Sequence, residues 1–297
     1  MKAVAMWGGG ITSWAVGRYA VDTHGPDNVT LLFADTKAED ADMPRFNADC
    51  ERQLGVPLTV VADGRTPEQV DIDRRWLSNS RTAQCSFWLK IVPCRKWLDA
   101  NCDPANTIVY VGIDWTEMER LPGQHMGYAH RAPGVCAKPK YCRSLFDENG
   151  RLEGPGCKHL LDVPWRVDAP LTRAPYRTKD MHIAAFRALG YDEPEMYRLG
   201  FEHNNCAGSC IRGGQAHWAQ VLRVRPELFA AKEAHEKRMQ DLLGTSVTVL
   251  KEQRGGTVQP LSLTELRQRL EGRALGLFDE NDLGGCGCFV DLALTAS

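Results

Sequence analysis

The sequence opens with Lys2-Ala3-Val4-Ala5-Met6, a short apolar run that passes through Trp7-Gly8-Gly9-Gly10 into Ile11-Thr12-Ser13. Residues 13–21 have the apolar spacing of a helix, and Thr12 or Ser13 is a suitable N-cap. A buried strand, a glycine turn and a helix form the repeating unit of an α/β fold with a parallel sheet. This stretch therefore decides the fold class that we predict.

The next hundred residues or so continue the same alternation. Apolar, β-branched runs predict strands over 29–34 (VTLLFA), 57–62 and 107–113 (TIVYVGI), and amphipathic stretches predict helices over 43–54, 67–76 and 87–101. Continuous apolar strands separated by helices are typical of a parallel sheet that is covered on both faces. We predict a doubly wound, mostly parallel α/β sheet.

The character of the sequence changes after residue 120. Glycine, proline and basic residues dominate residues 121–165 without a sustained period, which indicates an irregular insertion. Helices are predicted over 178–189, 213–223, 226–243 and 263–270, and a strand over 245–252. We expect a nucleotide-binding α/β domain over 1–175, which carries the insertion, and a mainly helical region with cysteine pairs over 176–297.

The composition excludes several classes of protein. Of the 297 residues 43% are hydrophobic and 25% charged, which is ordinary for a soluble globular chain. The 36 basic and 38 acidic residues give a net charge of −2, which excludes nucleic-acid binding by bulk charge but leaves room for a local basic patch. No apolar run approaches the roughly 18–20 residues of a membrane span. Glycine appears too early for a signal peptide, so we expect a cytoplasmic protein without a membrane partner.

The glycine run is placed where an α/β fold binds phosphate. Glycine lets the backbone approach an anion, and the following helix offers unpaired N–H groups. The run lacks the spacing of the dinucleotide motif GxGxxG and the lysine of the P-loop, so a dehydrogenase-type fold is disfavoured. A tight turn in which the glycines serve only packing is the alternative. The residues that we predict to bind nucleotide phosphates are Gly8, Gly9, Gly10, Ile11, Thr12 and Ser13.

At these residues the chain resembles the PP-loop ATP pyrophosphatases and the phosphoadenosine phosphosulfate (PAPS) reductases, because Gly9–Ser13 is similar to their SGG-x-x-S loop. Further similarities follow in order: Phe33-Ala34-Asp35-Thr36 with Glu39, Lys90-Ile91-Val92-Pro93 with Trp97-Leu98, and Gly112-Ile113-Asp114 with Glu117 and Arg120. Residues 190–210 resemble the C-terminal half of PAPS-reductase-like proteins, many of them from phage and mobile elements.

The resemblance implies an adenine nucleotide alpha hydrolase-like fold that binds ATP with magnesium, or PAPS. Lys90 would contact a nucleotide phosphate, with Thr36, Gly112 and Arg120 close by. Asp35 could meet the ribose or magnesium, or simply cap a turn, while Glu117 could hold magnesium or bridge to Arg120. Gly8 stands where the family has serine, and the family's Glu-Cys-Gly-Leu-His tail is absent.

The eleven cysteines form two groups of candidate ligands. An odd number without an export signal argues against a disulfide framework. Cys206 and Cys210 precede a predicted helix whose N-terminus should lower thiol pKa, and Cys286 and Cys288 lie in a glycine-rich tail. These four thiols match the number needed for a [4Fe–4S] cluster or tetrahedral zinc, with redox thiols as the alternative. A second candidate zinc site in the insertion consists of Cys136, Cys142, Cys157 and His159.

Three functions remain open from the sequence. In the first, ATP is cleaved to AMP and pyrophosphate so that an acceptor is adenylylated, in sulfur transfer or in modification of a nucleoside or nucleic acid. In the second, PAPS or adenosine phosphosulfate is reduced to sulfite by a thiol, with Cys286 or Cys288 as the nucleophile. The third is a non-catalytic nucleotide-binding regulator. The expected partners are an adenine nucleotide, a sulfur donor protein or a nucleic-acid substrate, and a second copy in a homodimer.

Overall fold

A five-stranded parallel sheet forms the centre of the structure, a computed structural model that describes residues 1–79, 83–120, 145–146, 152–153, 165–254, 256–272 and 282. The strands are β1 (Lys2–Trp7), β2 (Val29–Asp35), β3 (Leu58–Ala62), β4 (Thr107–Tyr110) and β7 (Arg166–Asp168). Their order is β3-β2-β1-β4-β7, and every neighbouring pair is parallel. The predicted α/β class with a parallel sheet is therefore confirmed.

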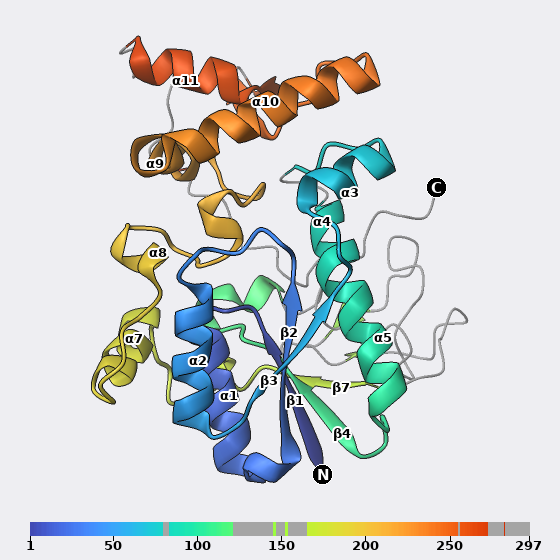
Figure 1. Ribbon diagram of the computed structural model, residues 1–297, viewed down its shortest axis with the longest axis vertical. Helices are drawn as coiled ribbons and strands as arrows, with labels where there is room; N and C mark the ends of the chain where they lie inside the picture. Colours follow the sequence, from blue (N-terminus) through green and yellow to red (C-terminus); the bar gives the residue numbers. More distant parts are fainter. Residues whose placement is uncertain are drawn as a thin grey trace.

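Helices cover both faces of this sheet (Figure 1). One face carries α1 (Ile11–His24), α2 (Met43–Leu54) and α7 (Lys179–Arg187), whose buried side chains join one core cluster. The other face carries α5 (Val92–Asn101), which packs against β1, β2 and β4 through a separate cluster. Both faces of the strands are thus apolar, which explains why the strand sequences are continuous rather than alternating.

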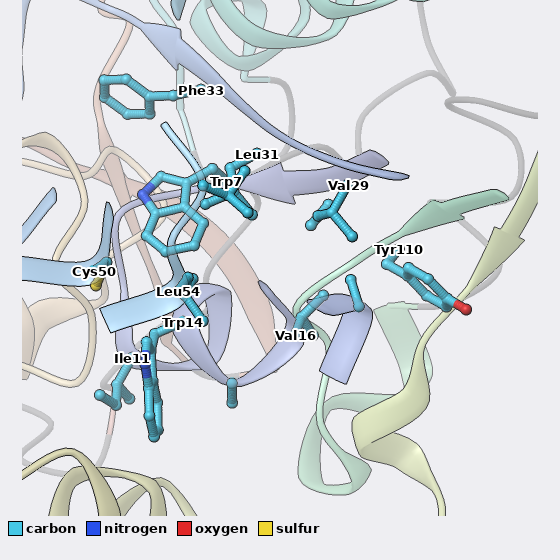
Figure 2. Packing of buried hydrophobic residues seen from close by; sticks show 14 of the residues in the cluster. Trp7, Ile11, Trp14, Val16, Val29, Leu31, Phe33, Cys50, Leu54 and Tyr110 are labelled. Atoms are coloured by element: carbon cyan, nitrogen blue, oxygen red, sulfur yellow. The ribbon is translucent and has the colours of Figure 1, made fainter. Parts of the chain in front are cut away.

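The core under α1 fixes the position of the first helix (Figure 2). Trp7 and Leu31 project from adjacent strands toward α1 and α2, and Trp7 has no exposed surface. A Cβ atom added to Gly17 would lie only 3.1–3.2 Å from side-chain atoms of Trp7, Leu31 and Leu54. Glycine at this position lets α1 approach the sheet closely, and the close approach holds the N-terminus of α1 at the end of β1.

A second body with its own core follows from residue 195. It contains α8 (Glu195–Arg198), the 3₁₀ turn η6 (Cys206–Gly208), α9 (Gln215–Val224), α10 (Pro226–Leu243), the hairpin of β8 (Leu250–Arg254) and β9 (Thr257–Leu261), and α11 (Leu263–Glu271). Its core includes Trp218, Phe229 and Met239. In Figure 1 the helices α9, α10 and α11 lie together at the end of the molecule beyond the sheet.

Shorter elements complete the description: η1 (Pro26–Asn28), α3 (Pro67–Arg74), α4 (Gln84–Ser86), the π-helical turn η2 (Phe87–Ile91), η3 (Trp115–Arg120), β5 (Leu145–Phe146) paired with β6 (Leu152–Glu153), and η5 (Pro170–Thr172). The helix predicted over 87–101 is interrupted by this π turn. The strand predicted over 245–252 begins at Leu250 and pairs with β9, which the sequence analysis missed. Within the described ranges, no helix is long and apolar enough to cross a membrane.

Candidate functional site

The strand order defines a crevice at the carboxyl edge of the sheet. The chain runs from β1 outward to β2 and β3 and then returns to place β4 on the other side of β1. In open α/β sheets, ligands bind at the point where the strand order reverses, outside the carboxyl ends of the strands. Here that point lies between β1, which ends in the glycine run, and β4, which leads to Gly112.

Seven of the predicted nucleotide-site residues line a single pocket at this crevice, which we call the phosphate pocket. They are Gly8, Gly10, Thr12, Ser13, Gly112, Glu117 and Arg120, and the lining also includes Lys179, Tyr197, Asn204 and Asn205. Its volume of about 70 Å³ is well below the roughly 300–1,000 Å³ of complete small-molecule sites. The pocket therefore has room for phosphate groups, and the rest of a nucleotide would lie outside it.

Two of the glycines are required by close contacts. Gly9 has φ +74°, and an added Cβ atom would lie 2.3 Å from Sδ of Met43. A Cβ atom on Gly10 would lie 2.9 Å from the hydroxyl of Tyr197. The glycine run thus lies between Met43 of α2 and Tyr197. Because the end of the Met43 side chain is flexible, the positive φ of Gly9 is the stronger reason for a glycine at that position.

Hydrogen bonds hold the loop but leave part of it open. The amide of Gly8 donates to Oγ of Ser13 (3.0 Å), the amide of Ile11 donates to the hydroxyl of Tyr197 (3.1 Å), and Nδ2 of Asn204 donates to the carbonyl of Gly9 (2.7 Å). Helix α1 has no side-chain N-cap. The amides of Gly10 and Thr12 find no acceptor among the described residues. Unpaired amides at a helix N-terminus attract anions.

An arginine on α2 connects that helix to the segment that carries Tyr197. Arg45 donates to the carbonyl of Asp192 (2.9 Å) and to that of Glu193 (3.0 Å). Asp42 accepts from the amide of Glu195 (2.9 Å). These bonds hold the start of α8 beside α2, so that Tyr197 reaches the glycine run. Tyr197 and Asn204 lie in the range 190–210, which the sequence connects to this site only through the family resemblance, because nothing in local spacing connects them to the glycines.

Charged side chains also line the phosphate pocket. Glu117 and Arg120 form an ion pair of 2.6 Å, which is one of the two roles expected for Glu117. Nζ of Lys179 donates to the backbone carbonyl of Glu202 at 2.5 Å. The same Nζ lies 3.4 Å from Oε2 of the Glu202 carboxylate. Arg120 and Lys179 bring positive charge to the pocket wall, where it favours an anion.

The predicted residues Thr36 and Lys90 line a different hollow, which we call the thiol pocket. It contains Cys206 and Cys210 together with Cys85, a cysteine that the sequence analysis did not assign to any site. Cys85 lies in α4, and Lys90, five residues later, lies within the π turn of η2. Such π turns are frequent at functional sites, but this one could not be recognised from composition or period.

Two thiols of this pocket, those of Cys85 and Cys206, are protonated at neutral pH. Burial raises the pKa of Cys206 to about 12, and burial likewise raises that of Cys85 to about 12. Lys90, which is 4% exposed, opposes both shifts without overcoming them. The prediction of a lowered pKa at Cys206 is therefore wrong, because α9 begins only at Gln215 and the thiol lies deep among protein atoms.

The predicted metal ligands are only partly described. No three His, Cys, Asp or Glu side chains converge closely enough to hold a metal ion in the described part of the chain. Cys286 and Cys288, and the alternative group Cys136, Cys142, Cys157 and His159, lie outside the described residues. Asp282 is described: its Oδ2 accepts from the amide of Gln215 and its carbonyl from that of Ala216, both at 3.0 Å.

Asp35 lies near the carboxyl edge but lines neither pocket. Its carboxylate accepts from the amide of Lys37 (2.8 Å) and from Nζ of the same residue (2.5 Å). Burial by itself would raise the pKa of Asp35, but these hydrogen bonds and the lysine charge outweigh it and lower the pKa. Asp35 thus forms a turn with Lys37, which is the structural role that the sequence left open for it.

Comparison with known proteins adds no assignment. No protein-family model matches this chain, and a search of the curated proteins finds no match.

Proposed function

We propose that this chain is a PP-loop enzyme of the PAPS-reductase-like kind, with the adenine nucleotide alpha hydrolase-like variant of the α/β fold. It binds the phosphates of ATP in the phosphate pocket and cleaves ATP to AMP and pyrophosphate. The observation that carries the proposal is a pair of amides, on Gly10 and Thr12, that find no acceptor in the described part of the chain and lie at the crevice between β1 and β4. Backbone amides at such a point favour a phosphate-bearing ligand.

The proposed reaction is an adenylyl transfer. An oxygen of the acceptor attacks the α-phosphorus of ATP and forms a new P–O bond, while the bond to the bridging oxygen breaks and pyrophosphate leaves with its electron pair. The acceptor proton passes to solvent. The amides of the glycine run, with Arg120 and Lys179, stabilise negative charge on the departing pyrophosphate. Magnesium enters as part of the substrate, bound mainly by phosphate oxygens.

The thiol pocket includes Cys206, which directly follows Asn205 of the phosphate pocket. We assign the proposed sulfur function to the thiol pocket. Cys206 and Cys210 remain our proposed ligands for a [4Fe–4S] cluster or zinc, together with Cys286 and Cys288. Cys85 lines the same pocket, but we do not add it to the ligands, because no three such side chains converge on one point in the described part of the chain. No step of the adenylyl transfer depends on this metal.

Reduction of PAPS to sulfite is the weaker candidate. That reaction needs a thiolate that attacks sulfur, whereas the pKa values of Cys85 and Cys206 are raised to about 12. The described thiols therefore do not favour it, and its candidate nucleophiles Cys286 and Cys288 lie outside the described residues. A nucleotide-binding regulator without turnover is an outcome that the following experiment distinguishes.

The test is a product analysis with ATP labelled in the γ-phosphate. We expect release of labelled pyrophosphate and unlabelled AMP, with no labelled orthophosphate. Asn205 lines the phosphate pocket and is 9% exposed, so Asn205→Asp adds a negative charge there with little change of shape. This variant should lose at least tenfold in ATP affinity, because the added carboxylate repels the phosphates.

A matched variant controls for the charge. Asn106 is exposed and precedes β4, at the amino edge of the sheet, so Asn106→Asp adds the same charge away from the pocket and should bind ATP normally. ATP binding without cleavage would support the regulator instead. Formation of ADP and orthophosphate, or equal loss of affinity in both variants, would refute the proposal.

A further inference from the structure

A third hollow, larger than the phosphate and thiol pockets, lies beside α1, α7 and η5. We call it the arginine groove. It has a volume of about 440 Å³, and its charged lining consists of Arg18, Arg173, Arg177 and Asp22. Trp14 and Leu171 contribute apolar wall. The volume lies within the range of functional ligand sites, and nothing in the sequence analysis assigned a role to this region.

Aromatic rings with exposed faces line and border the groove. Tyr19 lines it and is 37% exposed. Tyr176 lies between Pro175 and Arg177, which both line the groove, and is 61% exposed. Trp115 is 38% exposed, packs edge to face on Tyr176 with ring centroids 5.9 Å apart, and donates Nε1 to the carbonyl of Arg177 (3.1 Å). The ring pair is therefore held in place while remaining open to solvent.

The charges of the groove leave a net positive site. Arg173 is neutralised by a two-pronged ion pair with Asp168 (2.6 and 2.8 Å), and Arg18 makes only a long contact of 3.4 Å with Asp22. The guanidinium of Arg177 forms no ion pair with any described residue. An anion in the groove would thus meet Arg177 and the exposed part of Arg18.

A buried histidine on α7 also indicates that the groove takes a polar ligand. His182 lines the groove and is 5% exposed, and its Nε2 has no hydrogen-bond partner among the residues that the structure describes. Burial and the charge of Arg177 lower the pKa of His182, so the ring is neutral at neutral pH. A buried polar group without a partner is costly unless a ligand or water satisfies it.

The arginine groove and the phosphate pocket are adjacent. Thr12 and Ser13 line the pocket, whereas Trp14 and Ala15, on the same turn of α1, line the groove. At the start of α7, likewise, Arg177 lines the arginine groove, and Lys179, two residues later, lines the phosphate pocket. The two sites thus share the first turn of α1 and the start of α7, so that an extended ligand that crosses from one to the other has only a few residues of each element to pass.

We propose that the arginine groove binds a single strand of nucleic acid, with its phosphates at Arg18 and Arg177 and an unstacked base against Tyr176 and Trp115. Single-stranded nucleic acid is recognised by such a combination of basic groove and exposed ring faces. A free nucleotide is usually enclosed by its pocket, whereas here the rings lie on the outer rim. The groove would present this strand as the acceptor of the adenylyl transfer, and in that respect alone the inference rests on the proposed function.

The test is fluorescence anisotropy of a short labelled oligothymidylate, with no ATP present and at several salt concentrations. The single strand should bind more tightly than a duplex. Tyr176→Ala should weaken binding roughly five- to 150-fold, the range measured for loss of one base stack. Arg177→Ala should reduce the slope of log K against log salt by about 0.7, the value of one phosphate contact on a single strand.

Matched variants outside the groove are available. Trp76 is 45% exposed near the end of α3, and Arg238 is exposed on α10, so Trp76→Ala and Arg238→Ala should bind the strand normally. Binding that is unchanged by Tyr176→Ala and Arg177→Ala would refute the groove as the site, and so would competition by free thymidine monophosphate at equal nucleotide concentration. Asn205→Asp should lose ATP but keep the oligonucleotide, so that the two proposals can fail separately.

Discussion

The phosphate pocket and the thiol pocket are built from the same parts of the chain, but the first is suited to a negatively charged ligand and the second keeps its own ionisable thiols neutral. Each combines residues of the N-terminal sheet region with residues of the segment 197–212. The phosphate pocket offers unpaired amides and cationic side chains to an anion. In the thiol pocket burial keeps cysteines protonated, although Lys90 lies among them.

The two pockets therefore differ in whether their ligand-binding groups are already in the binding form before the ligand arrives. Amides fixed by backbone geometry need no reorganisation when phosphate arrives, which is the basis of electrostatic preorganisation. A protonated thiol must lose its proton before it binds metal or attacks sulfur. The first pocket is therefore ready for its ligand in the folded chain, and the second becomes chemically active only when binding displaces protons.

The largest expected effect concerns the reactivity of the thiols. With a pKa of about 12, Cys85 and Cys206 should react with iodoacetamide at pH 8 roughly a thousandfold more slowly than an ordinary cysteine. The rate should rise about tenfold per pH unit up to pH 10, because the thiolate is the reactive form. Mass spectrometry of the modified peptides measures each site. The same chain in guanidinium provides the control, and rapid modification of folded Cys206 at pH 8 would contradict the contrast.

The second effect tests the rigidity of the phosphate pocket. Gly9→Ala combines a positive φ with a Cβ atom 2.3 Å from Met43, whereas Gly64→Ala has φ +100° and nothing within 4 Å. We expect Gly9→Ala to lower the free energy of unfolding by about 2–5 kcal/mol, and Gly64→Ala by about 1–2 kcal/mol. Urea denaturation measures both. Only Gly9→Ala should also weaken ATP binding. Equal losses of unfolding free energy in the two variants would mean that the contact between residue 9 and Met43 contributes nothing to stability.

The smallest effect decides to which pocket Lys90 belongs. The charge of Lys90 lowers the pKa of both Cys85 and Cys206. Lys90→Met should slow alkylation of these thiols at pH 10 by about tenfold, the effect of one pKa unit. ATP affinity should change less than twofold, because Lys90 lines the thiol pocket. A large loss of ATP affinity would instead support the phosphate contact that the family resemblance implies.

The sequence predicts this fold well where each element carries its own signals. The helix predicted over 226–243 coincides with α10, because Pro226 favours a first turn and Gly244 ends the helix with φ +65°. The buried strands are predicted to within a few residues, since continuous apolar runs are long enough to recognise. β7 has only three residues and β9 is mostly exposed, so neither carries a hydrophobic pattern.

The site is predicted less completely, for a physical reason. The glycine run is a local feature, and its residues lie where the strand–turn–helix pattern places them. The assignment of Thr36 and Lys90 to the thiol pocket, and the approach of Cys85 to Cys206, depend on how distant segments pack. A single sequence gives no measure of that packing. The pKa of Cys206 could not be predicted either, because it depends on burial rather than on the nearest helix.

The hydrogen bonds from α9 to Asp282 make the start of that helix depend on a distant part of the chain. Asp282 accepts from the first two amides of α9, and it lies 67 positions after Gln215. A chain cut before Asp282 would keep Trp218 and Phe229 of the core and yet lose this cap. Loss of Asp282 would thus first loosen the first turn of α9.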